Sequence, residues 1–367
     1  MSKNECRGNY LYGGIFHMKL FRFFSLITFL LFLISCSGQF TPSRAFGKRE
    51  SFDDTVLEEG EKLVSFACWN TQTFFDALVD GCEYSEFQKK DKWTSSMYEK
   101  RLDNLCEVMK MLNSDIIVLE EIENISVVQD IVNRMAGQSW DSKKNWQYTC
   151  FAKEIGTAIG CAVFSRYKIS EMIVHTLDIR VHESAQPSQR PMMQVTVEVD
   201  DKDIVIFVNH WKSKSGGEEE SEIWRDWQEM LLAEKISELI NDKKTDASCS
   251  IIACGDFNRS AEEFIVSSDL EKKTNLVLRG ADGNLVKVFS PWMNLRGQYD
   301  NERGSYFYKD SWERIDNIFA VSNVKITRFH ELNVEPVADE EGRPVSYKMY
   351  NESGYSDHLP LQCVLII

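Results

Sequence analysis

The sequence predicts an α/β protein in which two packed β-sheets are covered by helices on both outer faces. Two observations carry this prediction. Short apolar runs alternate with helical patterns near both ends of the domain, and the middle, from about residue 147 to 208, contains successive β-rich runs with few helical patterns between them. Strands that follow one another without helices are expected to be antiparallel neighbours.

The first part of the domain reads as strand, helix, strand, helix. An apolar run over 63–69 predicts a strand that ends at Asn70, and a second over 116–119 predicts a strand whose end carries Glu121. Between them, apolar residues recur at the three- to four-residue spacing of one buried helix face: these are Tyr98, Leu102, Leu105, Met109 and Leu112. A second helix is expected around 128–135.

The middle and last parts add further strands and one long helix. Runs over 147–151, 158–164, 192–199 and 204–208 are typical of strands, with glycines and an Asp-Asp turn between them. A helix is expected over 224–240, and the acidic residues 218–220 suit its N-terminal end because of the helix dipole. Strands over 250–254, 315–321 and 361–366 complete the sheets.

Composition limits the function. The chain has 367 residues, of which 43% are hydrophobic and 27% charged, so a large folded core is expected. Its net charge of -15 argues against a protein that holds nucleic acid through a broad basic face. A nuclease remains compatible with this charge, since a divalent metal ion can supply positive charge where the phosphate binds.

The N-terminal region has the anatomy of a targeting segment. A basic stretch over 18–22 precedes an apolar run over 23–34, which is short for a membrane span. The run ends in Leu-Ile-Ser-Cys, which looks like a bacterial lipobox and would make Cys36 the lipidated first residue; the alternative is a signal anchor with an incidental cysteine. We therefore expect a membrane-anchored lipoprotein of the bacterial cell envelope, in the periplasm or at the cell surface.

These features divide the chain into four parts. Residues 1–17 are expected to be a mis-annotated extension, because Met18 directly precedes the basic stretch. Residues 18–36 form the expected signal peptide, 37–60 a polar flexible tether, and 61–367 the folded domain.

The cysteine pattern does not suggest a zinc site, since Cys-x-x-Cys and His-Glu-x-x-His are both absent from the sequence. Cys68, Cys161, Cys254 and Cys363 lie in apolar runs, where cysteine acts as a small buried hydrophobic residue. Export would permit disulfides, and the pairing is left open.

Polar residues follow several of the predicted strands. They are Asn70, Glu121, Asp256, Asn258 and Asp357, with the imidazoles of His210 and His358 in similar positions. The ends of strands are where α/β sheets keep their chemistry, although Gly255-Asp256-Phe257-Asn258 alone is equally compatible with a plain turn. Hard divalent cations such as Mg2+ prefer oxygen ligands, so the set suggests a metal-assisted hydrolase.

Six short motifs occur in an order that resembles the endonuclease/exonuclease/phosphatase superfamily. They are Trp69-Asn70, the run from Asp115 to Glu121, Asn209-His210, Gly255-Asp256-Phe257-Asn258, Arg314-Ile315-Asp316 and Ser356-Asp357-His358. The resemblance extends over about residues 64–366, and the 209–217 loop and 304–316 look most like the bacterial extracellular-nuclease branch. It implies a four-layer α/β/β/α sandwich of two packed mixed sheets, with the site at one mouth of the sheets.

The resemblance also implies a metal site and a base. Glu121 would bind Mg2+, with Mn2+ or Ca2+ as possible substitutes. Asn70 would orient the ligand set and Asp357 would join it. Asp256 would align or deprotonate the attacking water, and Asn258 would hold the phosphate.

The remaining implied roles concern charge on the phosphate. Asp316 would pair with His358, fixing its tautomer and favouring the imidazolium form. His210 would contact a phosphate oxygen, and Arg190 and Lys212 would add positive charge at the rim, although Arg190 beside a proline is equally well explained as closing a turn.

Two positions depart from the family pattern: Glu120 stands where many relatives carry Gln, and Gln72 stands where several place an acid. Because alternate strand residues point to opposite faces, Glu120 is expected to point away from Glu121.

The chain is expected to be a monomer, and three functions are compatible with it. The leading one is a Mg2+-dependent nuclease acting on DNA or RNA in the cell envelope. The second keeps the chemistry but acts on a phospholipid head group or inositol phosphate, for which Trp292, Tyr306, Tyr308 and Trp312 are possible lipid contacts if they are not core residues. The third is a non-catalytic surface lipoprotein on the same fold.

Overall fold

The computed structural model describes residues 16–17, 57–89, 91–137, 145–177, 187–242, 249–266, 275–294, 298–299 and 303–367. The expected signal peptide, its Cys36 and most of the expected tether lie outside these residues. Within the described part, no helix combines the length and the apolar character needed to cross a membrane.

One sheet has seven strands in the order β1-β4-β5-β3-β2-β17-β16. In chain order these strands are β1 (Phe16–His17), β2 (Leu63–Phe74), β3 (Ile116–Ile122), β4 (Tyr148–Ala152), β5 (Gly160–Ser165), β16 (Lys325–Glu331) and β17 (Leu361–Ile366). β2 and β3 are parallel, and the other pairs are antiparallel, so the sheet is mixed.

The second sheet has eight strands in the order β10-β11-β12-β15-β9-β8-β7-β6. In chain order these are β6 (Lys168–His175), β7 (Met192–Val199), β8 (Lys202–His210), β9 (Ser250–Asp256), β10 (Ile265–Val266), β11 (Asn275–Arg279), β12 (Leu285–Phe289) and β15 (Asp316–Ser322). Only β8 and β9 run parallel to each other here. A separate hairpin joins β13 (Tyr306–Tyr308) to β14 (Ser311–Glu313).

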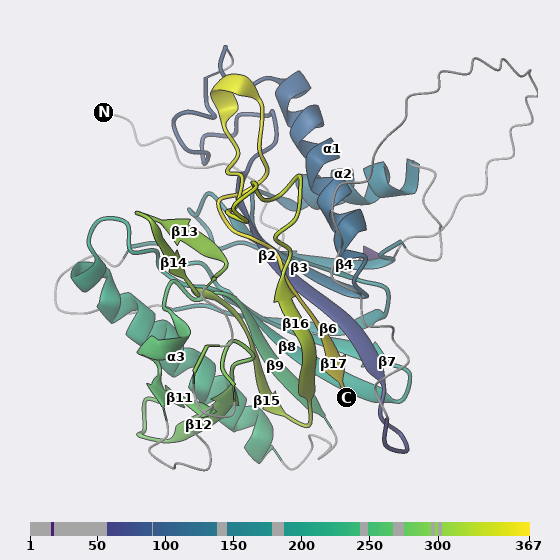
Figure 1. Ribbon diagram of the computed structural model, residues 1–367, viewed down its shortest axis with the longest axis vertical. Coiled ribbons are helices and arrows are strands. Elements are labelled where there is room, and N and C mark those ends of the chain that lie inside the picture. Colours follow the sequence, from purple (N-terminus) through teal and green to yellow (C-terminus); the bar gives the residue numbers. More distant parts are fainter. Residues whose placement is uncertain are drawn as a thin grey trace, which may run out of the picture.

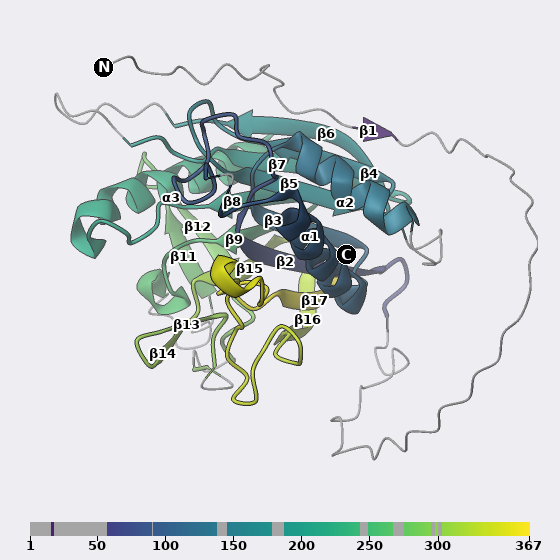
Figure 2. The same ribbon diagram turned by 90° about the horizontal axis from the view of Figure 1, so that it is seen from above.

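Helices cover the outer faces of the paired sheets. α1 (Ser95–Leu112) and α2 (Ile125–Gly137) lie together on one side, and α3 (Glu218–Asn241) lies on the opposite side (Figures 1 and 2). The ends of α1 are capped locally: the Thr94 side chain accepts a hydrogen bond from the Met97 amide, and Asn113 ends the helix in the left-handed conformation. The expected α/β/β/α sandwich is confirmed.

Strand alternation places the two core layers. Phe66 and Cys68 of β2 face the other sheet, whereas Ala67 and Trp69 face α1 and α2. The first layer continues through the second sheet to the apolar face of α3. All seven free cysteines of the described residues are buried, including the four expected to be hydrophobic core residues.

The predicted elements are found with shifted ends. The strands over 192–199 and 361–366 match, but β2, β3 and β8 run on to include Asn70, Glu121 and His210. The β-rich middle does not form a single antiparallel series, because β4 and β5 belong to the first sheet and β6, β7 and β8 to the second. Strands β1, β6, β10, β11, β12 and β16 and the β13–β14 hairpin were not predicted; several are short or alternate with polar residues, which weakens their signal.

Candidate active site

The strand ends meet at one mouth of the sandwich. In the second sheet, His210 pairs in register with Asp256, and Asp256 pairs with Asp316 at the start of the antiparallel β15. In the first sheet, Asn70 lies in register with Glu120, the residue before Glu121. The 356–358 segment enters β17 beside the end of β2, where the Ser356 hydroxyl donates to the Asn70 carbonyl at 2.6 Å.

The Gly255-Asp256-Phe257-Asn258 step has a backbone that restricts its residues. Gly255 has φ 124°, and a Cβ there would lie 1.9 Å from the Asn209 carbonyl oxygen, so only glycine fits between β8 and β9. Asn258 is left-handed at φ 47°. This turn brings two donors of Asn258 back to the Asp256 carboxylate. The Asn258 backbone nitrogen lies 2.8 Å from Oδ1, and its side-chain Nδ2 lies 3.0 Å from Oδ2.

Asp316 and His358 form a buried ion pair. Nδ1 of His358 lies 2.8 Å from Oδ2 of Asp316, and the Ser305 hydroxyl donates to the same oxygen at 2.5 Å. Burial alone lowers the pKa of His358, but the charge and hydrogen bond of Asp316 together with the charges of Asp357 and Asp256 outweigh it and raise that pKa well above the ordinary value. The imidazole is therefore held as imidazolium.

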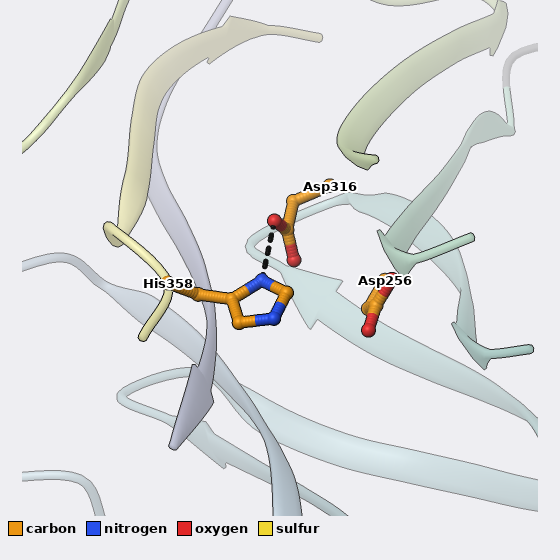
Figure 3. Close-up of side chains that lie close together, drawn as sticks. All are labelled: Asp256, Asp316 and His358. Atoms are coloured by element: carbon orange, nitrogen blue, oxygen red, sulfur yellow. Dashed lines mark hydrogen bonds and ion pairs between the residues drawn. The ribbon is translucent and has the colours of Figure 1, made fainter. Parts of the chain in front are cut away.

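Asp256 lies beside this pair (Figure 3), and one donor atom from each of Asp256, Asp316 and His358 falls within 4.8 Å of the others. Burial, followed by the Asp316 charge, raises the pKa of Asp256 to about 7. A carboxylate with this pKa is suited to accept a proton near neutral pH.

Asn70 joins Asp256 to Glu121. Its Nδ2 lies 3.2 Å from Oδ2 of Asp256 and 3.3 Å from Oε1 of Glu121. Glu121 has φ 62°, which turns its side chain out of the strand alternation, and its Oε2 accepts the Thr73 backbone N–H at 2.5 Å. Burial, followed by the Asp357 charge, raises the pKa of Glu121.

His210 is a neutral imidazole facing the two carboxylates. Burial, helped by Arg190 and His358, lowers the pKa of His210 well below its usual range. Its Nε2 lies 3.5 Å from Oε1 of Glu121 and 3.7 Å from Oδ2 of Asp256, whereas its buried Nδ1 has no hydrogen-bond partner. His358 is therefore held as a cation, whereas His210 is held neutral.

The donor set fits a hard divalent cation. Glu121 and Asp357 are close enough for the charge of Asp357 to raise the pKa of Glu121, and the oxygens of carboxylate and amide groups are the ligands that Mg2+ takes. Two further carboxylates, Asp256 and Asp316, are buried in the same site. A phosphate group would be repelled by this concentration of negative charge unless a cation accompanied it. Asn70 turns its Nδ2 toward Glu121, which makes it an orienting group in this geometry.

The expected rim cations both contact backbone carbonyls. Arg190 donates to the carbonyls of His210 and Trp211, the first at 3.0 Å from Nε, so it fixes the end of β8 as well as adding charge. The Lys212 ammonium donates to the Ser213 carbonyl at 3.1 Å and lies 3.4 Å from that of Ser215.

Some supporting contacts had no signal in the sequence. Arg101 of α1 is buried, donates to the carbonyls of residues 71–73 and stacks on Tyr347 at 4.0 Å, which fixes the left-handed turn after Asn70. In the sequence, Arg101 lies in a charged helical segment and cannot be told from a surface residue. The Tyr306 ring lies 4.7 Å from the His358 ring, and only the pairing of β13 with residue 358 brings them together.

Glu120 and Gln72, the two departures from the family pattern, lie in different surroundings. Glu120 faces the interior between the sheets, with both carboxyl oxygens buried and without hydrogen-bond partners. Burial, then Asp316 and Asp256, raises the pKa of Glu120 well above its ordinary value, which favours the neutral carboxyl form. The side-chain oxygen of Gln72 accepts a hydrogen bond from the Tyr347 backbone N–H at 2.7 Å.

Comparisons with solved structures support the fold. TDP2 from Caenorhabditis elegans superposes with a TM-score of 0.52 at 12% identity, covering 83% of this chain and 75% of that chain. D. rerio TDP2 humanised by 14 mutations gives a TM-score of 0.52 at 16% identity, covering 83% of this chain and 98% of that chain. No curated protein matches the sequence.

The sequence profile described as the Endonuclease/Exonuclease/phosphatase family matches residues 65–365, which include every residue of the site described above and reach all strands of both sheets except β1. Members of this family are in general metal-dependent phosphoesterases and nucleases. The fold, the strand-end carboxylates and this match agree, and the chain belongs to the endonuclease/exonuclease/phosphatase family.

Proposed function

We propose that this protein is a Mg2+-dependent phosphodiester hydrolase that cuts DNA or RNA. The observation that carries the proposal is the buried cluster of Asp256, Asp316 and His358, joined through Asn70 to Glu121. It combines a base near neutral pKa, a fixed imidazolium and a set of oxygen ligands, which are the groups that phosphodiester hydrolysis requires.

Each residue has one task in this proposal. Glu121 and Asp357 hold the cation, which when bound supplies positive charge to a phosphoryl oxygen. Asp256 takes a proton from the attacking water. The His358 imidazolium, held by Asp316, stabilises the charge that develops on the phosphoryl group.

The two amides and the second imidazole orient these groups. Asn70 aligns Glu121 with Asp256. Asn258 donates through Nδ2 to Asp256 at 3.0 Å and to the Trp211 carbonyl at 3.2 Å, so contact with a phosphate would use one of these N–H groups. Neutral His210 donates from Nε2 to a phosphate oxygen, with Arg190 and Lys212 adding charge at the rim.

An aromatic series beside His358 favours nucleic acid as the substrate. Tyr306 lies against the His358 ring, and Tyr308 stacks on Tyr306 with centroids 6.1 Å apart and planes at 21°. Tyr308 is 50% exposed, and Lys309 lies over its ring. An exposed aromatic ring next to a phosphate site provides a surface on which a nucleobase stacks. Trp292, in contrast, is buried and contributes to the core.

A substrate panel tests the proposal. The full chain with Mg2+ is expected to degrade DNA or RNA and to lose that activity on addition of EDTA or in Asp256→Ala and His358→Ala. Cleavage of sphingomyelin or an inositol phosphate with nucleic acids left intact would replace the nuclease by the lipid or inositol phosphoesterase, and no hydrolysis of any substrate would favour a surface-binding protein.

The stacking surface has its own test. Tyr308→Ala is expected to raise the KM for a single-stranded oligonucleotide about 10-fold, since a stacked base contributes about 1–3 kcal/mol, and to leave kcat unchanged. Tyr350→Ala is the matched control, because Tyr350 is 83% exposed in the separate 3-10 helix Met349–Asn351. Equal KM values for the two variants would remove Tyr308 from the substrate site.

We further propose that the enzyme works in the bacterial cell envelope, anchored through a lipid on Cys36. The leader-like sequence over 18–36 supports this. Cys36→Ala is expected to release the protein from the membrane fraction; a variant that stays membrane-bound and unprocessed would favour the signal-anchor alternative.

A further inference from the structure

A second group of carboxylates lies outside the phosphodiester site. Asp80, Glu83 and Glu123 each offer one oxygen, and these oxygens all lie within 4.8 Å of one another. Asp80 and Glu83 belong to the segment that joins β2 to α1, and Glu123 directly follows β3. Glu83 is 5% exposed and Glu123 only 1% exposed, whereas Asp80 is open to solvent.

The hydrogen bonds of this cluster leave one buried oxygen unused. Glu83 accepts the backbone N–H groups of Asp80 at 2.5 Å and Gly81 at 2.9 Å, and Oε2 of Glu123 accepts that of Asp76 at 2.6 Å. Oε1 of Glu123 is buried and has no hydrogen-bond partner. A buried carboxylate oxygen without a donor is costly and points to a missing ligand.

The protein compensates the charge of the cluster only weakly: burial and the Asp76 charge raise the pKa of Glu123 to about 8, and Lys153 opposes them without forming an ion pair. In the described parts of the chain, no Lys, Arg or His forms an ion pair with any of its three carboxylates. The Asp76 carboxylate adds a fourth negative charge nearby, and both of its oxygens already accept hydrogen bonds, from Leu78 and Asn124. Like charges at this separation repel strongly in a buried site.

We propose that Asp80, Glu83 and Glu123 bind a divalent cation, with Ca2+ preferred, at a site separate from the one at Glu121. Ca2+ takes six to eight oxygen ligands in flexible geometry, which suits carboxylates from an irregular segment with waters on the open side at Asp80. Mg2+ requires a nearly octahedral set and retains its waters more strongly, so it suits this cluster less well.

The cation would be structural. It would join residues 80–83 to the end of β3, two residues beyond Glu121. The end of β3 is already attached to β2 and to the start of this segment, because the Thr73 backbone N–H donates to Glu121 and the Asp76 backbone N–H donates to Oε2 of Glu123 at 2.6 Å. Binding would therefore stabilise the connection that supports Glu121, without contact with the substrate.

Calcium binding to the full chain tests this proposal. A background of Glu121→Gln with Asp357→Asn removes the carboxylates proposed for the catalytic cation, so the result is independent of the proposed nuclease activity. In this background, calorimetry is expected to find one Ca2+ per chain, and saturating Ca2+ is expected to raise Tm by about 5 °C. Adding Asp80→Asn and Glu123→Gln is expected to abolish both effects.

The control is Glu86→Gln, an exposed acid of the same segment, which is expected to keep Ca2+ binding. In EDTA, the Asp80→Asn, Glu123→Gln variant is expected to have a Tm at least equal to that of its parent, because charge repulsion is relieved. Undiminished Ca2+ binding in that variant, no Ca2+ binding in its parent, or an equal loss of Tm with and without Ca2+ would overturn the proposal.

Discussion

Replacing Asp316 by Asn keeps the shape of the side chain beside His358 but removes its charge. In the native protein the two groups are 2.8 Å apart and almost fully buried. A hydrogen bond to a charged partner contributes about 1.5–3 kcal/mol, and every 1.4 kcal/mol corresponds to about a tenfold change in rate. We therefore expect kcat to fall about 10- to 100-fold at neutral pH.

The pH profile identifies the cause of that loss. With Asp316 neutral, burial dominates and the pKa of His358 falls, so the imidazolium form is lost at a lower pH than in the native enzyme. The rate of oligonucleotide hydrolysis, measured across pH, should decline on its alkaline side at lower pH and recover when the variant is acidified. The control is Asp310→Asn, an exposed acid in the β13–β14 turn.

The ion pair also predicts how stability depends on pH. Because the folded-state pKa of His358 is raised above its unfolded value, the pair's contribution to stability is fully present below about pH 6.5 and is lost as pH rises through the raised folded-state pKa. Asp316→Asn should remove this dependence. An unchanged alkaline limb in Asp316→Asn, or an equal shift in Asp310→Asn, would refute the assigned role of the pair.

Three further substitutions test other parts of the structure. Asp256→Asn should lower kcat by about 10²–10⁴-fold, and in the native enzyme the rate should rise as pH increases through about 7, where Asp256 loses its proton; a rate independent of pH in that region would contradict its role as base. Glu120→Gln should increase the free energy of unfolding at alkaline pH, because the raised pKa of buried Glu120 means that its contribution falls as pH rises; chemical denaturation at two pH values measures the difference. Gly255→Ala should destabilise the fold by about 3 kcal/mol or more, since its Cβ would meet the Asn209 carbonyl, and a Tm equal to that of the native chain would disprove this.

The ends of the buried strands were predictable because their signal is local. Apolar runs ending at Asn70, Glu121 and Asp256 indicate strands whose last residues reach the edge of a sheet, and the order of the motifs added the family. It was harder to predict from the sequence to which sheet each strand belongs. β5 and β6 follow each other closely in the chain but belong to different sheets, and no local pattern encodes this.

The contacts that tune the site depend on the folded chain. Ser305 donates to Asp316, and Arg101 binds the carbonyls of residues 71–73 near the end of β2 from a helix that begins more than twenty residues later along the chain. The sequence placed Asp316 in a strand next to His358 only through the family resemblance. The opposite charge states of His210 and His358 arise from burial and from Asp316, which are properties of the assembled sheets.

We propose that one buried site of this protein uses a divalent cation to hydrolyse phosphodiesters in nucleic acid. The most direct measurement is the initial rate of cleavage of plasmid DNA by the native chain and by Glu121→Gln, titrated with Mg2+ after treatment with EDTA. We predict no cleavage without the metal, a saturable rise in rate for the native chain and almost none for the variant. Cleavage that persists in EDTA, or a native response to Mg2+ in Glu121→Gln, would contradict the claim.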